Sequence, residues 1–132
     1  MLKQISVFLD NTPGLLAKFT KILLDNNINL RALSVSETAD FGILRILVDK
    51  TDECVKVLKE NNYLTTLMDV IAVEIPDKPG ALHEVAKILG DNNINIEYLY
   101  STLIKENAMI VLRVDNNEKT VGILKNNGIK TL

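Results

Sequence analysis

The sequence is short of the residues that most often carry chemistry. It holds one cysteine, Cys54, and one histidine, His83. A single cysteine cannot form an internal disulfide, and no second Cys or His stands at metal-ligand spacing from it. The histidine has no Asp or Ser partner at motif spacing, so it makes a poor catalyst. We therefore expect no metal site, no cofactor and no catalytic centre, and a lone thiol favours a reducing, cytoplasmic compartment.

Long apolar runs and an excess of one charge are also missing. No stretch is long enough to cross a bilayer, and residues 2–6 read as a strand rather than as a signal peptide. The 132 residues have a formal net charge of −2, with acidic and basic residues interspersed, which disfavours nucleic-acid binding. The 47 % of apolar residues is enough to fill a core. A soluble protein that binds neither membrane nor nucleic acid is therefore expected.

An internal repeat accounts for the whole chain. Pro13-Gly14 recurs 66 positions later as Pro79-Gly80, and residues 21–29 recur as residues 87–95. The register holds without a gap, and about a third of the aligned pairs are identical, far above chance. Two units, residues 1–66 and 67–132, are therefore predicted in place of one larger domain. No linker separates them, so we expect at most a short turn near Asp69.

Each repeat shows the pattern of a βαββαβ unit. In the first repeat a strand is expected over residues 5–9, followed by a helix that has Pro13 at its first position and Thr12 or Asn11 as its cap. Asn26-Asn27 ends this helix, because asparagine tolerates the left-handed conformation. The remaining elements are strands at 28–35, 43–48 and 63–68 and a helix from Asp52.

The predicted fold class is therefore α+β, with two ferredoxin-like units in which both helices cover one face of an antiparallel sheet. Side by side, the units would give an eight-stranded sheet with four helices on one face. The other sheet face would then need cover, and the last strand, residues 129–132, is cut short by the chain end. We therefore expect a homodimer.

The loop after the first strand of each repeat resembles the signature of the ACT-domain family. In that family an Asp or Asn, then any residue, then Pro-Gly, lies between the first strand and the first helix. The first repeat has Asn11-Thr12-Pro13-Gly14 and the second has Asp77-Lys78-Pro79-Gly80. A second landmark, an Asn-containing turn into the next strand, is present as residues 27–30 and 93–96. The whole chain thus resembles a small stand-alone tandem ACT protein.

The resemblance implies a regulatory protein without chemistry of its own. ACT domains bind small ligands, mostly amino acids, where two ACT units meet, and such modules regulate a partner metabolic enzyme. Carried over by position, the ligand-binding residues are Asn11, Gly14, Leu15 and Asn29 in the first unit and Asp77, Gly80, Ala81 and Asn95 in the second. A helix N-terminus suits a carboxylate, glycine permits close approach, and an Asp or Asn side chain suits an ammonium. Some family members carry a histidine two residues before the Asn position, where this chain has Leu9 and Ile75.

Plainer interpretations stay open. Asn11 and Asp77 can serve only as turn or cap residues, and Asn29 and Asn95 can serve only to satisfy backbone groups. An enzyme of this topology would need an Arg in the loop, an RNA-binding module would need basic and aromatic central strands, and a metal carrier would need Cys-x-x-Cys. None of these is present. The alternative that remains is a ligand-free structural module for dimerisation or protein interaction, and ligand binding alone distinguishes the two.

Overall fold

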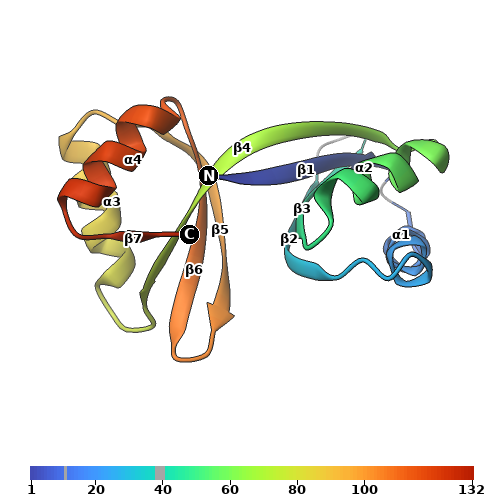
Figure 1. The fold of residues 1–132 in the computed structure, drawn as a ribbon, viewed down its shortest axis with the longest axis horizontal. Coiled ribbons are helices and arrows are strands. Elements are labelled where there is room, and N and C mark those ends of the chain that lie inside the picture. The colour runs from blue at the N-terminus through green and yellow to red at the C-terminus, as the bar shows by residue number, and fades with distance from the viewer. Residues whose placement is uncertain (11, 38–40) are drawn as a thin grey trace. The chain divides into compact units, whose positions relative to one another are not determined.

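The structure, a computed structural model, describes residues 1–10, 12–37 and 41–132. The chain divides into two compact units, an N-terminal unit of Lys3–Met68 and a C-terminal unit of Asp69–Leu132 together with Met1–Leu2. Each unit contains two helices and its own strands, which can be followed in Figure 1.

The N-terminal unit has the expected βαββαβ order. Its strands are β1 (Leu2–Leu9), β2 (Leu30–Glu37), β3 (Gly42–Val48) and the first part of β4 (Leu64–Pro76), and its helices are α1 (Leu15–Asp25) and α2 (Thr51–Glu60). The strands lie in the order β2-β3-β1-β4. Alternate apolar residues of β1 and β3, such as Ile5 and Ile46, pack with Phe19 of α1 and Leu58 of α2 in one buried cluster. Both helices therefore cover the same face of this unit's strands.

The C-terminal unit repeats this arrangement. It contains the second part of β4, α3 (Ala81–Asp91), β5 (Ile96–Ile104), β6 (Asn107–Val114), α4 (Asn117–Asn126) and β7 (Lys130–Thr131). Strand β4 pairs antiparallel with both β6 and β7, and β6 pairs in turn with β5. Its core again joins alternate strand residues, such as Val73 and Leu112, to Leu89 of α3 and Leu124 of α4.

Strand β4 accounts for the main departure from the expected fold. It runs for 13 residues through Asp69 without a turn, so the last strand of one repeat and the first strand of the next are a single element. Its only proline is its final residue, Pro76, and it contains no glycine, while Thr, Val and Ile favour an extended chain. The described residues therefore form seven strands, not the eight that were predicted.

The four helices end in the same way. The side-chain amide of an asparagine donates to the carbonyl four residues earlier at 2.8 Å in each helix, at Asn26, Asn61, Asn92 and Asn127. The next residue adopts a positive φ, of 55° at Asn27, 65° at Asn62, 59° at Asn93 and 71° at Gly128. Asparagine and glycine tolerate this conformation, which turns the chain away from the helix. The prediction that Asn-Asn ends the first helix is confirmed.

The sheet face turned away from the helices is not left bare. Ala32 and Leu47 in the N-terminal unit are 6 % and 4 % exposed, and Ala72 and Val111 in the C-terminal unit are fully buried. The expectation of a homodimer assumed that this face is left bare, and that premise does not hold at these four residues. Exposed apolar side chains lie instead on the outer strands β2 and β5, where Val35 is 56 % exposed.

Candidate functional site

The loops that precede α1 and α3 share one backbone conformation. Gly14 and Gly80 both have a φ of 89°, with ψ of −11° and −14°. Residues other than glycine rarely adopt this left-handed backbone conformation, because their Cβ crowds the following carbonyl. A Cβ built on either glycine would meet no atom within 4 Å. The backbone angle therefore requires glycine, and the space beside each glycine is open.

Helix α1 begins two residues later than Pro13, the first helical position that the sequence suggested, whereas α3 begins at Ala81 as expected. Pro13 lies in a turn before α1, and Gly14 is the N-cap, whose carbonyl accepts from the Lys18 N–H at 3.1 Å. A left-handed residue cannot belong to the helix, so α1 starts at Leu15. Glycine has no side chain that could cap, and neither α1 nor α3 has a side-chain cap. The expectation of Thr12 as the cap is wrong, and Asn11 lies outside the described residues.

The first helical amides differ in their availability. The N–H of Leu15 donates to the Thr12 carbonyl at 3.4 Å, and that of Ala81 donates to the Lys78 carbonyl at 3.3 Å, so both predicted donors already make long turn bonds. The next two N–H groups of each helix find no acceptor within the described part of the chain; they belong to Leu16, Ala17, Leu82 and His83. Unpaired N–H groups and the helix dipole favour an anion. The absence of a side-chain cap is the signal that identifies these donors.

Asp77 is exposed and lies in the same loop as Gly80. Over residues 41–132, all of which the structure describes, its carboxylate makes no hydrogen bond or ion pair. The second loop thus combines open amide donors, a left-handed glycine and an uncommitted carboxylate. These are the groups that would contact the carboxylate and the ammonium of an amino acid.

Asn29 and Asn95 lie at the opposite ends of the helices from the glycines. The Asn29 N–H donates to Oδ1 of Asp49 at 3.0 Å, and the Asn95 N–H donates to Oδ1 of Asp115 at 3.2 Å. Helix α1 has 11 residues, which corresponds to about 16 Å at 1.5 Å per residue. No single unit therefore brings Gly14 together with Asn29, or Gly80 together with Asn95. Asn29 instead borders a shallow hollow of about 270 Å³.

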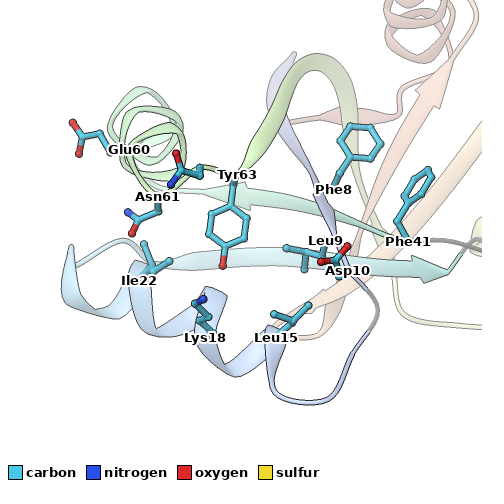
Figure 2. Close-up of a pocket in the computed structure, with 11 residues that line it drawn as sticks. Phe8, Leu9, Asp10, Leu15, Lys18, Ile22, Phe41, Glu60, Asn61 and Tyr63 are labelled. Carbon is cyan, nitrogen blue, oxygen red and sulfur yellow. The ribbon is translucent and has the colours of Figure 1, made fainter.

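A larger hollow, of about 460 Å³, lies in the N-terminal unit and was not predicted (Figure 2). Its lining comes from the end of β1, one side of α1, the chain before β3 and the end of α2: Phe8, Leu9, Asp10, Leu15, Lys18, Ile22, Phe41, Glu60, Asn61, Asn62 and Tyr63. Sequence reasoning treated these residues as core, surface and turn positions, because the space appears only when both helices lie on the strands. Of the predicted site residues that the structure describes, only Leu15 lines it.

The remaining chemistry-bearing groups are structural. Burial raises the pKa of the Cys54 thiol to about 11, and the nearby Asp49 carboxylate adds to this effect. The fully buried thiol is therefore protonated at neutral pH. Among the described residues, no three His, Cys, Asp or Glu side chains gather in a way that could hold a metal ion. No helix in the described part of the chain is both long and apolar enough to span a membrane.

Comparison with known proteins agrees with the architecture of both units. The family model of the ACT domain pair matches residues 1–131. The chain belongs to the ACT domain pair family. No functionally curated protein is similar enough in sequence to match it.

Three solved structures illustrate the similarity. A protein from Bacteroides thetaiotaomicron is 40 % identical with a TM-score of 0.95, covering 99 % of this chain and 91 % of the other. The ligand-free regulatory subunit of aspartate kinase from Thermus thermophilus is 14 % identical with a TM-score of 0.70, covering 94 % and 90 %. The regulatory subunit of aspartate kinase from Thermus flavus is also 14 % identical, with a TM-score of 0.65 and the same coverage. At 14 % identity these two show a shared fold.

Proposed function

We propose that this chain is a non-catalytic regulatory protein that binds an amino acid at its two glycine loops and thereby modulates a partner metabolic enzyme. The observation that carries the proposal is the loop geometry, which occurs twice. Gly14 and Gly80 have the same left-handed backbone, and each precedes an uncapped helix with open N–H groups. Such a site accepts a carboxylate at the N-terminus of the helix.

In this proposal each repeat, residues 1–66 and 67–132, acts as one ACT unit. The ligand carboxylate contacts the first-turn amides, and the ligand ammonium contacts Asn11 in the first loop and Asp77 in the second. Because Asp77 has a negative charge and Asn11 has none, the second loop binds an ammonium more tightly. Asn29 and Asn95 lie too far along the helix to reach the same ligand, so they belong to the wall that a second copy of the chain supplies.

A homodimer formed through the outer strands fits this requirement. On the helix-facing side of β2, Leu33 and Val35 are 46 % and 56 % exposed, and on β5 Leu99 and Leu103 are 39 % and 69 % exposed. Outer strands also present unpaired backbone groups, which a second strand can satisfy. An amino acid bound at such an interface changes the surface that the protein offers to a partner enzyme only if the amino acid binds two states of the protein with different affinity. We place this protein in the cytoplasm, where a free buried thiol stays reduced.

Two substitutions at one glycine test the loop site. Gly80→Ala adds backbone strain and little bulk, whereas Gly80→Asp adds the same strain together with a negative charge that repels a carboxylate. We expect calorimetric titration to show that the Asp variant loses amino-acid binding at this loop, while the Ala variant keeps most of it. Equal binding by both variants would rule out a carboxylate at the α3 amides.

The alternative function is a ligand-free dimerisation or protein-interaction module. The exposed apolar residues of β2 and β5 favour it as much as they favour the sensor, since both need an interface. The two functions differ in one respect. A dimerisation module does not bind amino acids, so the dissociation constant of its dimer is the same in their presence and absence.

A further inference from the structure

The described residues that line the hollow of about 460 Å³ all belong to the N-terminal unit, and among them only Leu15 is also a predicted residue of the glycine-loop site. Its volume falls within the range of small-molecule sites, roughly 300–1,000 Å³. One wall is the side of α1 formed by Leu15, Lys18 and Ile22, and the opposite wall is formed by the end of α2 and by Tyr63, which directly precedes β4. Polar side chains line one part of this hollow and apolar side chains line another.

Two of the polar side chains on the lining, Lys18 and Tyr63, point toward each other across the hollow in Figure 2, whereas the carboxylate of Glu60 points away from them. The other polar residues on the lining are Asp10, Asn61 and Asn62. The Tyr63 ring is half-buried and is held edge-on against Phe19, with ring centroids 5.5 Å apart at 90°. Its hydroxyl is therefore fixed in direction. No carboxylate of the described residues lies within ion-pair distance of the Lys18 ammonium, although Lys21 on the same helix is paired with Asp25. An ammonium and a phenol hydroxyl that converge in this way suit a carboxylate.

The apolar groups lie toward the end of the hollow where β1 ends and β3 begins. The rings of Phe8 and Phe41 contact each other with centroids 5.6 Å apart but point away from Lys18 and Tyr63 in Figure 2, so Leu9 and Leu15 are the apolar side chains beside the hollow there. Branched side chains of this kind favour an apolar ligand group. A carboxylate bound at Lys18 would direct its apolar group along the hollow toward these side chains.

The C-terminal unit supplies an independent comparison, because its residues 66 positions later occupy the matching places. Lys18 is replaced by Glu84 and Tyr63 by Ile129, so the positive charge is inverted and the hydroxyl is removed. Phe8 and Phe41 are replaced by Glu74 and Asn107, whose side chains hydrogen-bond each other at 3.4 Å. The changes at Lys18 and Tyr63 remove the anion-binding pair, while the glycine loops and helix ends stay the same.

We propose that this hollow is a second ligand site, present in the N-terminal unit only, for a small carboxylate that carries an apolar or aromatic group. The Lys18 ammonium and the Tyr63 hydroxyl bind the carboxylate, and Leu9 and Leu15 contact the apolar group. Asp10 also lies on the lining, near Leu9, and can accept a hydrogen bond from an ammonium. Its carboxylate therefore favours an amino acid over a carboxylate that has no ammonium. The site goes beyond the amino-acid sites at the loops and does not depend on them.

The test uses the full chain and two probes, L-phenylalanine and phenylacetate, which share a carboxylate and a ring but differ in the ammonium. Binding is followed by two-dimensional NMR on isotope-labelled protein. We expect one or both probes to shift the amide signals of Lys18, Asn61 and Tyr63 in saturable fashion at millimolar concentration. Preference for phenylalanine identifies an amino acid that uses Asp10, and preference for phenylacetate identifies a carboxylate without an ammonium.

The C-terminal unit suggests the sharpest variant, Lys18→Glu, which installs the residue found in the matching position. We expect it to weaken binding at least tenfold, and Tyr63→Phe to weaken it several-fold. The matched control is Lys21→Gln, on the same helix but outside the hollow, which leaves the dissociation constant unchanged. Gly80→Asp also leaves it unchanged, although it removes binding at the loop of the other unit.

Two results overturn the proposal. One is that neither probe shifts the signals of the lining residues, although the wild-type chain is folded. The other is that Lys18→Glu binds as tightly as the wild type, which places the ligand elsewhere. If Lys18→Glu abolishes these shifts while the amino-acid response at the Gly80 loop persists, the two sites are separate and both stand.

Discussion

Phe8 and Phe41 contact each other edge-on in the N-terminal unit, whereas Glu74 accepts a hydrogen bond from Asn107 at the matching places of the C-terminal unit. Both pairs join the first strand of a unit to the start of its third. The backbone register is the same, since Leu9 lies opposite Gly42 and Ile75 lies opposite Ala108. The duplicated framework therefore accepts an aromatic pair and a polar pair equally well, and side chains at these positions are free to take on a separate role in each unit.

Other pairs are retained in both units. Lys21 and Lys87 each form an ion pair with an aspartate four residues later, and the N–H groups of Asn29 and Asn95 each donate to an aspartate 20 residues later. The retained residues lie at helix ends and turns, where the backbone leaves polar groups that need partners. The comparison shows that residues that provide partners for backbone groups are the same in both units, whereas the pair that joins the first and third strands of a unit differs.

The largest expected difference between the units lies in their cores. Phe19 is fully buried, and its counterpart Val85 is 1 % exposed. We expect Phe19→Ala to lower the free energy of unfolding by about 3–5 kcal/mol and Val85→Ala to lower it by about 2 kcal/mol, since the smaller side chain leaves a smaller cavity. Urea unfolding followed by circular dichroism measures both. Equal losses would mean that the ring of Phe19 contributes no more than two methyl groups do.

The glycine loops are expected to respond alike. Gly14→Ala and Gly80→Ala should each cost about 1–2 kcal/mol, because alanine is strained at a φ of 89°. The control is Gly122→Ala inside α4, where nothing lies within 4 Å of the new Cβ and alanine favours the helix by about 0.5–1 kcal/mol. Thermal unfolding should therefore show opposite signs for loop and helix variants. A stabilising Gly80→Ala would contradict the assigned backbone angle.

The dependence of stability on alkaline pH should come from the N-terminal unit. The pKa of Cys54 rises from 9.0 to about 11 on folding, so above pH 9 the unfolded chain loses the thiol proton while the folded chain keeps it. The stability due to this group is complete below pH 9 and is lost as the pH rises toward 11. The matching residue, Thr120, does not ionise in this range. In Cys54→Ala the denaturation midpoint should fall less steeply between pH 9 and 11, and an identical slope would contradict the raised pKa.

The smallest effect is expected at acid pH, from the C-terminal unit. Glu74 accepts hydrogen bonds from Lys130 and Asn107, which lower the pKa of its carboxyl below 4.5. Its contribution is therefore present above pH 4.5 and is lost as the pH falls through the lower value of the folded state. The variant Glu74→Gln should flatten the acid limb of the stability curve. Hydrogen exchange at Lys130 and Thr131 tests whether this pair holds β7 against β4.

The sequence was informative wherever a pattern repeats or a backbone conformation demands a particular residue. Pro13-Gly14 and its copy predicted the loops, and Asn26-Asn27 predicted the end of α1. The cap was missed because Gly14 itself takes the cap position, and no sequence rule distinguishes it from Thr12 beforehand. The single β4 strand was missed because the tendency of residues 64–76 to extend outweighed the expectation of a turn near Asp69.

The hollow could not be predicted at all. Lys18 and Tyr63 are 45 positions apart in the sequence and meet only because α1 and α2 cover the same strands. Each residue alone has an ordinary role, as a surface lysine and as an aromatic side chain beside the core. A comparison of the two repeats position by position is the one sequence signal that marks them, since charge and ring are lost together in the second copy.

The central claim, that the glycine loops bind an amino acid, is tested most directly by a thermal-shift screen of the purified chain against the twenty amino acids. A ligand that binds only the folded chain adds about 2.7 kcal/mol at a hundredfold excess over its dissociation constant, which raises the unfolding midpoint by several degrees. We expect such a rise for one amino acid or a related group, and we expect Gly80→Asp to remove the part of the rise that comes from binding at the second loop. No rise with any amino acid at millimolar concentration would contradict the claim and leave a dimerisation module as the function.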